Sequence, residues 1–188
     1  MKVNPLILLA FLAATLSCSR KTNPQGNENT GKVPSAIEWV RFEDLAARQA
    51  KEPRKVFIDV YTDWCGWCKK MDAQSLTHPV IVKYMSSKFY AVKFNAETKD
   101  TIRFNGHTYT STNPSAPRST HQLALSLLNN KLGYPTTVYL DEDLKMLGPL
   151  QGYLDPKTME AVLHFYWDEA YKTTPWPTFQ ETFTGEIK

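Results

Sequence analysis

Two cysteines separated by two residues are the most reactive feature of this chain. Cys65 and Cys68 enclose Gly66 and Trp67, and they follow the apolar segment 56–61, Val-Phe-Ile-Asp-Val-Tyr. The pattern predicts a strand that runs into a helix, with Cys65 at the helix N-terminus, where free backbone N–H groups and the helix dipole favour a thiolate. Cys65 is therefore the expected nucleophile. Cys68 falls one turn later on the same helix face and is expected to resolve a mixed disulfide.

Other interpretations of this pair are less well supported. A structural zinc site needs about four ligands, whereas the chain has 3 cysteines in all. A purely structural disulfide would close a very short loop and gain little chain entropy. A copper carrier would need a histidine near the pair, but the histidines are scattered and none is at ligand spacing: His78, His107, His121 and His164. We therefore expect redox exchange by the Cys65–Cys68 pair, without a metal or another cofactor.

Two segments carry a resemblance to a known family. Residues 56–70, with Trp-Cys-Gly-Trp-Cys-Lys at their centre, resemble the active-site segment of thioredoxins. The segment 133–137, Gly-Tyr-Pro-Thr-Thr, is similar to the cis-proline loop that faces the dithiol in that family. The resemblance implies an α/β, thioredoxin-like fold with a central mixed β-sheet flanked by helices. Among relatives, the motifs look closest to the thioredoxin-like domains of exported thiol–disulfide interchange proteins, although Trp67 stands where thioredoxins usually carry proline.

The resemblance also assigns roles to two charged residues. Asp59 matches the buried aspartate that relays a proton to the resolving cysteine. Burial between apolar neighbours would raise its pKa toward neutrality, as a general base requires, while a solvent-facing carboxylate on a one-sided strand is the alternative. Lys93 matches the lysine that partners this aspartate, but a lysine in the segment 91–94, Ala-Val-Lys-Phe, fits a solvent-facing position equally well.

The same resemblance suggests how a substrate binds. Pro135 is expected to be cis, which would bring the backbone of Tyr134 beside the dithiol to pair with an extended substrate by strand addition. An ordinary trans turn before a strand is the alternative. Trp64 and Trp67, with Gly66 between the cysteines, are expected to contact the substrate or shield the thiols, unless the two tryptophans are simply packed.

The remaining chain alternates between strand and helix patterns, which favours an α/β sheet covered by helices. At 188 residues and 42% hydrophobic content, it has the size of one domain with one core. The expected elements are strands near 37–40, 56–61, 89–95, 135–140 and 150–153, and helices over 42–50, 65–74, from 79 onward, and 156–170.

An insertion of about 98–120 separates this chain from a minimal thioredoxin. Residues 101–110 predict a projecting β-hairpin that turns at Asn105-Gly106. A loop over 111–117 follows, and then a helix to about 130 that Ser119 or Thr120 would cap. The insertion raises a second function class, a thioredoxin-scaffold binding module or redox sensor that recognises a partner through the hairpin.

The N-terminus predicts export. Lys2 precedes the apolar run 6–16, which is too short to span a bilayer comfortably. The segment 15–18, Thr-Leu-Ser-Cys, resembles a lipobox in which leucine stands one place late, so Cys18 is either lipidated or left as a free thiol after simple cleavage. The expected organisation is an export signal (1–17), a flexible tether (18–35), the domain (36–172) and a C-terminal extension (173–188). We expect the protein at the periplasmic face of a bacterial membrane, anchored through a lipid on Cys18.

Charge and composition limit the partners. The formal net charge of +3 is too small and too dispersed along the chain to indicate binding to nucleic acid. No glycine-rich cofactor fingerprint is visible, so a reducing role needs electrons from another protein, for which a membrane thiol-transfer protein is expected. The expected substrates are exported proteins with disulfides or thiols. The same residues can run as an oxidase, but no large helical insertion of the kind seen in dedicated periplasmic oxidases is present, which favours a reductase or isomerase.

Overall fold

The computed structural model describes residues 35–188. The predicted export signal, Cys18 and the predicted tether up to residue 34 lie outside this part of the chain. Among residues 35–188, no helix combines the length and apolar character that crossing a membrane requires.

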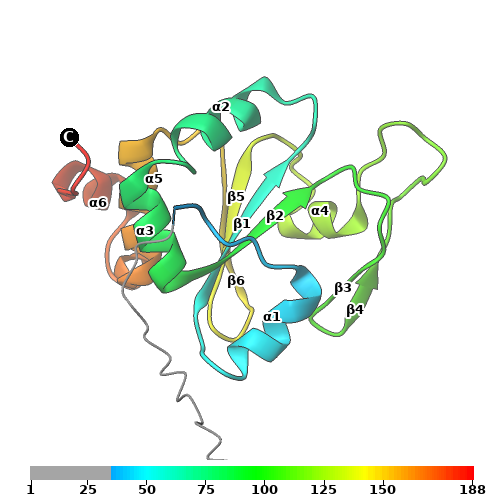
Figure 1. Cartoon of the computed structure of the whole chain (residues 1–188), viewed down its shortest axis with the longest axis horizontal. Coiled ribbons are helices and arrows are strands. Elements are labelled where there is room, and N and C mark those ends of the chain that lie inside the picture. Colours follow the sequence, from blue (N-terminus) through cyan, green and yellow to red (C-terminus); the bar gives the residue numbers. More distant parts are fainter. Residues whose placement is uncertain (1–34) are drawn as a thin grey trace, which may run out of the picture. The chain divides into compact units, whose positions relative to one another are not determined.

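A four-stranded mixed sheet forms the centre of the domain, as predicted (Figure 1). Its order is β2-β1-β5-β6, with bounds Lys55–Tyr61 for β1, Phe89–Asn95 for β2, Thr136–Leu140 for β5 and Met146–Gln151 for β6. β1 pairs parallel with β2 and antiparallel with β5, and β5 pairs antiparallel with β6. The central strand β1 is covered on both faces, which explains its nearly continuous apolar sequence.

Helices cover the two faces of the sheet and form two cores. The helices are α1 (Phe42–Gln49), α2 (Gly66–Gln74), α3 (Pro79–Lys88), α4 (Gln122–Leu127) and α5 (Pro156–Trp167). Ile58 and Val60 pack into the core that includes residues of α1 and α4, while Phe57 packs into the core that includes residues of α2, α3 and α5. Because side chains alternate along a strand, Asp59 shares the face of Phe57, beneath α2.

The predicted hairpin is confirmed, but it packs on the domain rather than projecting from it. β3 (Ile102–Phe104) and β4 (His107–Tyr109) pair antiparallel around Asn105 and Gly106. Both turn residues have positive φ, 49° and 78°, as a two-residue hairpin turn favours. The inner side of β3 is buried, and the ring of Phe104 lies 5.1 Å from that of Phe42 in α1. The apolar residues of β3 therefore join the domain core.

Two predicted strands differ from the observed ones. The strand expected over 37–40 is reduced to a single bridge between Trp39 and Ala91, because α1 begins at Phe42 and leads the chain away from the edge of β2. The last strand starts earlier than expected, at Met146, and contains Pro149. Proline is tolerated there because β6 is an edge strand with one side unpaired.

The helix of the insertion is shorter than predicted and has a different cap. It ends at Leu127, because Asn129 and Asn130 adopt positive φ of 51° and 59°. Ser119 does not cap it, since its hydroxyl contacts Ser111 and Thr112 and accepts the N–H of Asn113. Ser119 therefore holds the preceding loop closed.

The C-terminal residues pack against α5, which ends at Trp167 rather than near residue 170. A short 3-10 helix (Ala170–Lys172) leads to α6 (Trp176–Thr182). The rings of Trp176 and Phe179 lie 5.3 and 5.2 Å from Phe165. Beyond α6, the buried carboxylate of Glu160 accepts backbone N–H groups of residues 186 and 187.

His121 anchors the insertion to the domain. Its fully buried ring caps α4 by accepting the N–H of Leu123 at Nδ1, 3.2 Å, which leaves the proton on Nε2 to donate to the carbonyl of Asp100, 3.0 Å. Its backbone N–H donates to the carbonyl of Ala96 at the end of β2. Burial lowers the pKa of His121, and the hydrogen bond to Asp100 only partly opposes this.

Replacing His121 with alanine is expected to cost about 2 kcal/mol of unfolding free energy at pH 7, because a helix cap and a buried hydrogen bond are lost together. The folded state favours the neutral His121 ring. The ring therefore stabilises the fold fully above the pKa of an unfolded histidine, about 6.5, and this stabilisation decreases as the pH falls below that value. The stability of the alanine variant should not show this decrease between pH 7 and pH 5.5. Urea unfolding at pH 7 and pH 5.5 measures both effects, with the exposed His107→Ala as control. Equal stability of the two variants would contradict the anchoring role.

Candidate active site

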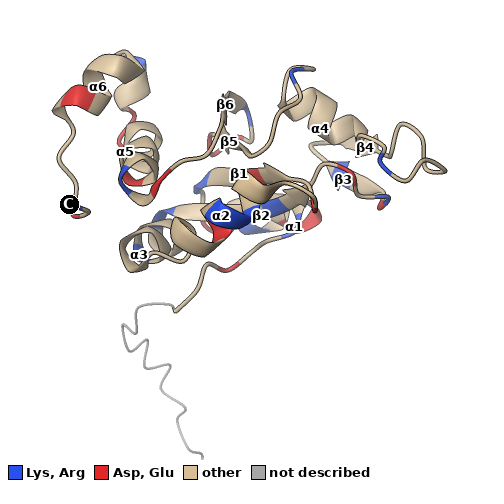
Figure 2. Ribbon diagram, turned by 90° about the horizontal axis from the view of Figure 1, so that it is seen from above, with Lys and Arg blue, Asp and Glu red and all other residues tan. Residues whose placement is uncertain are grey.

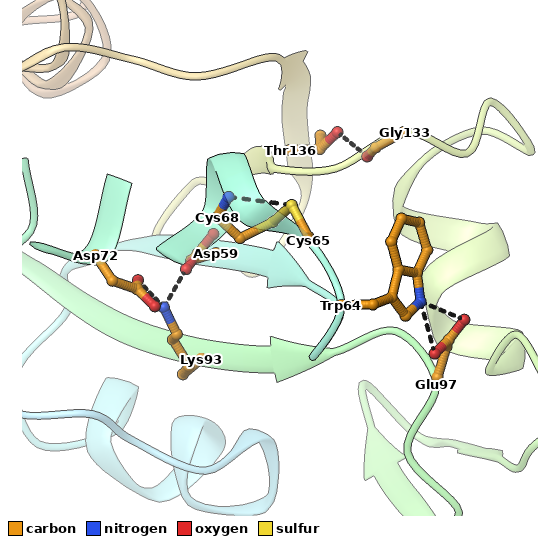
Figure 3. The surroundings of a disulfide bond; sticks show 9 residues. All are labelled: Asp59, Trp64, Cys65, Cys68, Asp72, Lys93, Glu97, Gly133 and Thr136. Carbon is orange, nitrogen blue, oxygen red and sulfur yellow. Dashed lines mark hydrogen bonds and ion pairs between the residues drawn. A yellow bond between two sulfur atoms is a disulfide. The ribbon is translucent and has the colours of Figure 1, made fainter. Parts of the chain in front are cut away.

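A disulfide between Cys65 and Cys68 occupies the N-terminus of α2 (Figure 3). Cys65 is the N-cap residue, and its Sγ accepts the backbone N–H of Cys68 at 3.0 Å. This is the strand-to-helix position that the sequence predicted. Cys65 is 5% exposed and Cys68 is 1% exposed, so Cys65 is the more accessible residue of the pair.

Asp59 and Lys93 form a partly buried ion pair beneath α2. The two residues lie opposite each other in the β1–β2 register, and Lys93 Nζ lies 2.6 Å from Asp59 Oδ2. Asp59 is fully buried, and its Oδ1 has no partner among the described residues. Burial raises the pKa of Asp59 to about 6, although the charge of Lys93 opposes this shift. Of the alternatives left open by the sequence, the structure therefore has Asp59 buried and Lys93 turned toward it.

Asp72 is a third charged residue at this site, and the sequence did not predict it. Lys93 Nζ also contacts the carboxylate of Asp72, which lies one turn after Cys68 on α2 and is 40% exposed. Burial lowers the pKa of Lys93, but the two carboxylates outweigh burial and hold its pKa above the ordinary value. Lys93 also lines a groove of about 850 Å³ along the edge of β2, together with Trp39 and Tyr61. The buried carboxyl is thus connected through Lys93 to a partly exposed carboxylate.

The loop before β5 lies beside the disulfide, as predicted. The Tyr134–Pro135 peptide bond is cis. Thr136 closes the loop by donating its hydroxyl proton to the carbonyl of Gly133 at 2.7 Å (Figure 3). The ring of Tyr134 meets that of Trp64 edge-on, with centroids 6.0 Å apart. Because Trp64 directly precedes Cys65, this contact brings the proline loop next to the dithiol.

Both tryptophans around the cysteines are exposed, Trp64 by 52% and Trp67 by 58%. Trp64 Nε1–H donates to both carboxylate oxygens of Glu97, each 3.1 Å away. Trp67 packs on Tyr153, with ring centroids 5.5 Å apart. A Cβ atom at Gly66 would meet nothing within 4 Å, so the surface between the two tryptophans is open. Neither Glu97 nor Tyr153 was predicted, because each comes from an element distant in sequence.

The described part of the chain offers no group of three or more His, Cys, Asp or Glu side chains that could hold a metal ion. Three of the histidines have structural partners: His78 caps α3, His121 caps α4, and His164 contacts Tyr84 and Asp168. The candidate chemistry of the site therefore rests on the two sulfurs and the carboxyl beneath them.

Replacing Asp59 with asparagine is expected to stabilise the protein above pH 7 by about 1–3 kcal/mol, since one pKa unit corresponds to about 1.4 kcal/mol. The folded state binds a proton on Asp59 up to about pH 6, whereas the ordinary pKa of an aspartate is 3.8. Stability should therefore decrease as pH rises through this window in the parent and not in the variant. Lys93 keeps Asp72 as its partner. Urea unfolding at pH 4.5 and pH 8 tests this, with the exposed Asp143→Asn as control, and a less stable Asp59→Asn at pH 8 would contradict it.

Comparisons with known proteins agree with this architecture. The thioredoxin-like domain family matches residues 42–167. Solved structures with the same fold include a thioredoxin-fold protein from Helicobacter pylori (TM-score 0.53, 16% identity, 79% of this chain and 90% of that chain covered). Another is a thioredoxin from Thermus thermophilus, with a TM-score of 0.51, 16% identity, and coverage of 70% of this chain and 87% of that chain. A third is the oxidoreductase DsbH, with a TM-score of 0.50, 16% identity, and coverage of 76% of this chain and 89% of that chain. No curated protein sequence matches significantly. Since the family match spans most of the domain, this chain belongs to the thioredoxin-like domain family.

Proposed function

We propose that this protein is a thiol–disulfide oxidoreductase that reduces or isomerises disulfides in exported proteins. One observation carries the proposal, namely the Cys65–Cys68 disulfide at a helix N-terminus above a buried carboxyl whose pKa is near 6. Membership of the thioredoxin-like family supports the same chemistry.

In the first step, the reduced protein attacks a substrate disulfide. Cys65 acts as nucleophile because a thiolate at the N-terminus of α2 receives the N–H of Cys68 and the positive end of the helix dipole. A bond forms between Cys65 Sγ and one substrate sulfur, and the other substrate sulfur leaves as a thiolate. Trp64, Gly66, Trp67 and the loop at Tyr134 and Pro135 form the surface on which the substrate would lie.

In the second step, Cys68 resolves the mixed disulfide. Asp59 accepts the proton of the Cys68 thiol, directly or through water, and Lys93 holds the carboxylate in place. The Cys68 thiolate attacks Cys65 Sγ, the Cys65–Cys68 disulfide forms, and the second substrate sulfur is released. The substrate gains two electrons, and the protein is left oxidised, as in the structure.

Continued reduction requires a dithiol donor that returns two electrons, for which we propose a membrane thiol-transfer protein. In isomerisation, a thiol of the substrate itself attacks the mixed disulfide, and no net electron transfer occurs. The location outside the cytoplasm and the lipid on Cys18 rest on the N-terminal sequence alone. The alternative of a binding module gains no specific support, because Ile102 and Phe104 of the hairpin are buried in the domain.

The residues between the cysteines favour the reducing direction. A strongly oxidising dithiol owes its potential to stabilisation of the reduced form, often by a cation next to the thiolate. Gly66 and Trp67 provide no such charge, and the ionised form of Asp59 beneath the pair would disfavour a second negative charge.

Cysteine variants test the proposed roles. Cys68→Ser is expected to accumulate a mixed disulfide with a peptide disulfide substrate, because the nucleophile remains and the resolving thiol is gone. Cys65→Ser should form no comparable adduct, and turnover with dithiothreitol as donor should fall to background in both variants. Non-reducing electrophoresis and mass spectrometry detect the adduct, with the double serine variant as control. Adducts on Cys68 in the Cys65→Ser protein at the same rate would reverse the assignment.

The reduction potential tests the direction. We expect a value near that of thioredoxin, about −270 mV, for the purified protein equilibrated in dithiothreitol buffers. Thiol alkylation and the fluorescence of Trp64 and Trp67 report the fraction reduced. A potential near −120 mV would indicate an oxidant instead, and a pair that stays oxidised well below about −300 mV would indicate a structural disulfide.

A further inference from the structure

Two aromatic pairs, each with one exposed tryptophan and one partly buried tyrosine, include the residues that directly precede the two cysteines in the sequence. Trp64 and Tyr134 form one pair, and Trp67 and Tyr153 form the other; we call these four residues the rim. More than half of each tryptophan side chain is exposed. Exposed apolar surface concentrated around a reactive group is typical of a site that binds a partner.

A cation lies over each pair. The guanidinium carbon of Arg118 is 5.6 Å from the centre of the Trp64 ring. Lys70 Nζ lies 4.8 Å from the centre of the Trp67 ring and 5.0 Å from that of Tyr153. Such cation–π contacts hold the charged groups at the edge of the apolar surface and leave them accessible.

Arg118 comes from the insertion, which therefore reaches the active site. Glu97, in the turn between β2 and the insertion, accepts both hydrogen bonds from Trp64 Nε1. The loop that carries Arg118 is held by Ser119 and by Lys99, whose Nζ donates to the carbonyl of Ala116 at 2.6 Å. These contacts give Arg118 a defined position beside Trp64.

Neither cation at the rim is paired directly with a carboxylate. Neither Lys70 nor Arg118 makes a salt bridge within residues 35–188. Of the nearby acids, Asp72 pairs with Lys93, while Asp63 and Glu97 accept hydrogen bonds from the neutral side chains of Asn95 and Trp64 and keep their negative charge. Figure 2 shows the basic segment of α2 in blue. The rim therefore offers two cations without carboxylate partners.

We propose that the rim, with Lys70 and Arg118, selects protein substrates that carry Asp or Glu side chains next to their disulfide. The inference rests on the proposed function and adds a substrate class to it. An acidic side chain on either side of the substrate cysteine would pair with Lys70 or Arg118, while apolar parts of the segment pack on the tryptophans. Such charge pairing accelerates association and discriminates between partners more than it raises affinity.

The test compares three fluorogenic peptide disulfides of equal length, flanked by Glu, Gln or Lys, with dithiothreitol as donor. At about 20 mM salt we expect kcat/KM to be about tenfold higher for the Glu peptide than for the Lys peptide, as charge steering allows. The ratio should shrink at about 0.5 M salt, where the Debye length is only a few ångströms.

Charge reversal locates the effect. The double variant K70E/R118E is expected to remove or invert the Glu-to-Lys ratio, whereas K51E/K83E, with the same change in net charge on exposed residues at the end of α1 and on α3, should keep it. Circular dichroism verifies that both variants fold. A parent ratio near one, or a ratio unchanged in K70E/R118E, would overturn the inference and leave the proposed function standing.

Other outcomes separate the two proposals. Failure to reduce any of the three peptides would overturn the proposed function together with the inference. Equal rates for all peptides, combined with dimerisation in sedimentation velocity that K70E/R118E abolishes, would assign the rim to a second copy of the chain instead.

Discussion

One buried carboxyl group is the main constraint that the surrounding structure has to accommodate. Asp59 lies in the middle of the central strand β1, where a charge is costly unless it is paired. The parallel pairing of β1 with β2 brings Lys93 directly opposite, and α2 covers both residues and adds Asp72. The burial that raises the pKa of Asp59 to about 6 is also what packs α2, and with it Cys65 and Cys68, onto the sheet. The same contact therefore lowers stability at neutral pH and holds the candidate proton acceptor beneath the cysteines.

Features with local causes were predictable from the sequence. The dithiol at a helix N-terminus, the strand containing Asp59 and the hairpin turn at Asn105-Gly106 each follow from a short pattern of residues. The pairing of Asp59 with Lys93 required the strand register, which a sequence pattern does not specify, so it stayed open until the structure showed it. The prediction of a strand over 37–40 was wrong, because this segment forms only one bridge to β2 before the chain enters α1.

The residues that the sequence did not reveal come from distant elements. Arg118 reaches Trp64 because the insertion folds back beside the active site, Glu97 reaches it from the turn after β2, and Tyr153 meets Trp67 from beyond β6. Asp72 did leave a signal, since its spacing of four from Cys68 places both on one face of α2. The capping of α4 by His121 was hidden because Ser119 and Thr120 are better caps by propensity, yet Ser119 is occupied in the loop before it.

In the proposed mechanism, the ion pairs from Asp59 through Lys93 to Asp72 give protons a route that is separate from the site of electron transfer. Electrons pass at the sulfurs, between the exposed tryptophans, where a bound polypeptide would exclude water. Protons have a different route, because Lys93 opens onto the groove along the edge of β2 and Asp72 is 40% exposed. In the proposed mechanism, a substrate that covers the disulfide leaves the groove beside Lys93 uncovered, so protons would reach Asp59 through Lys93 rather than past the cysteines.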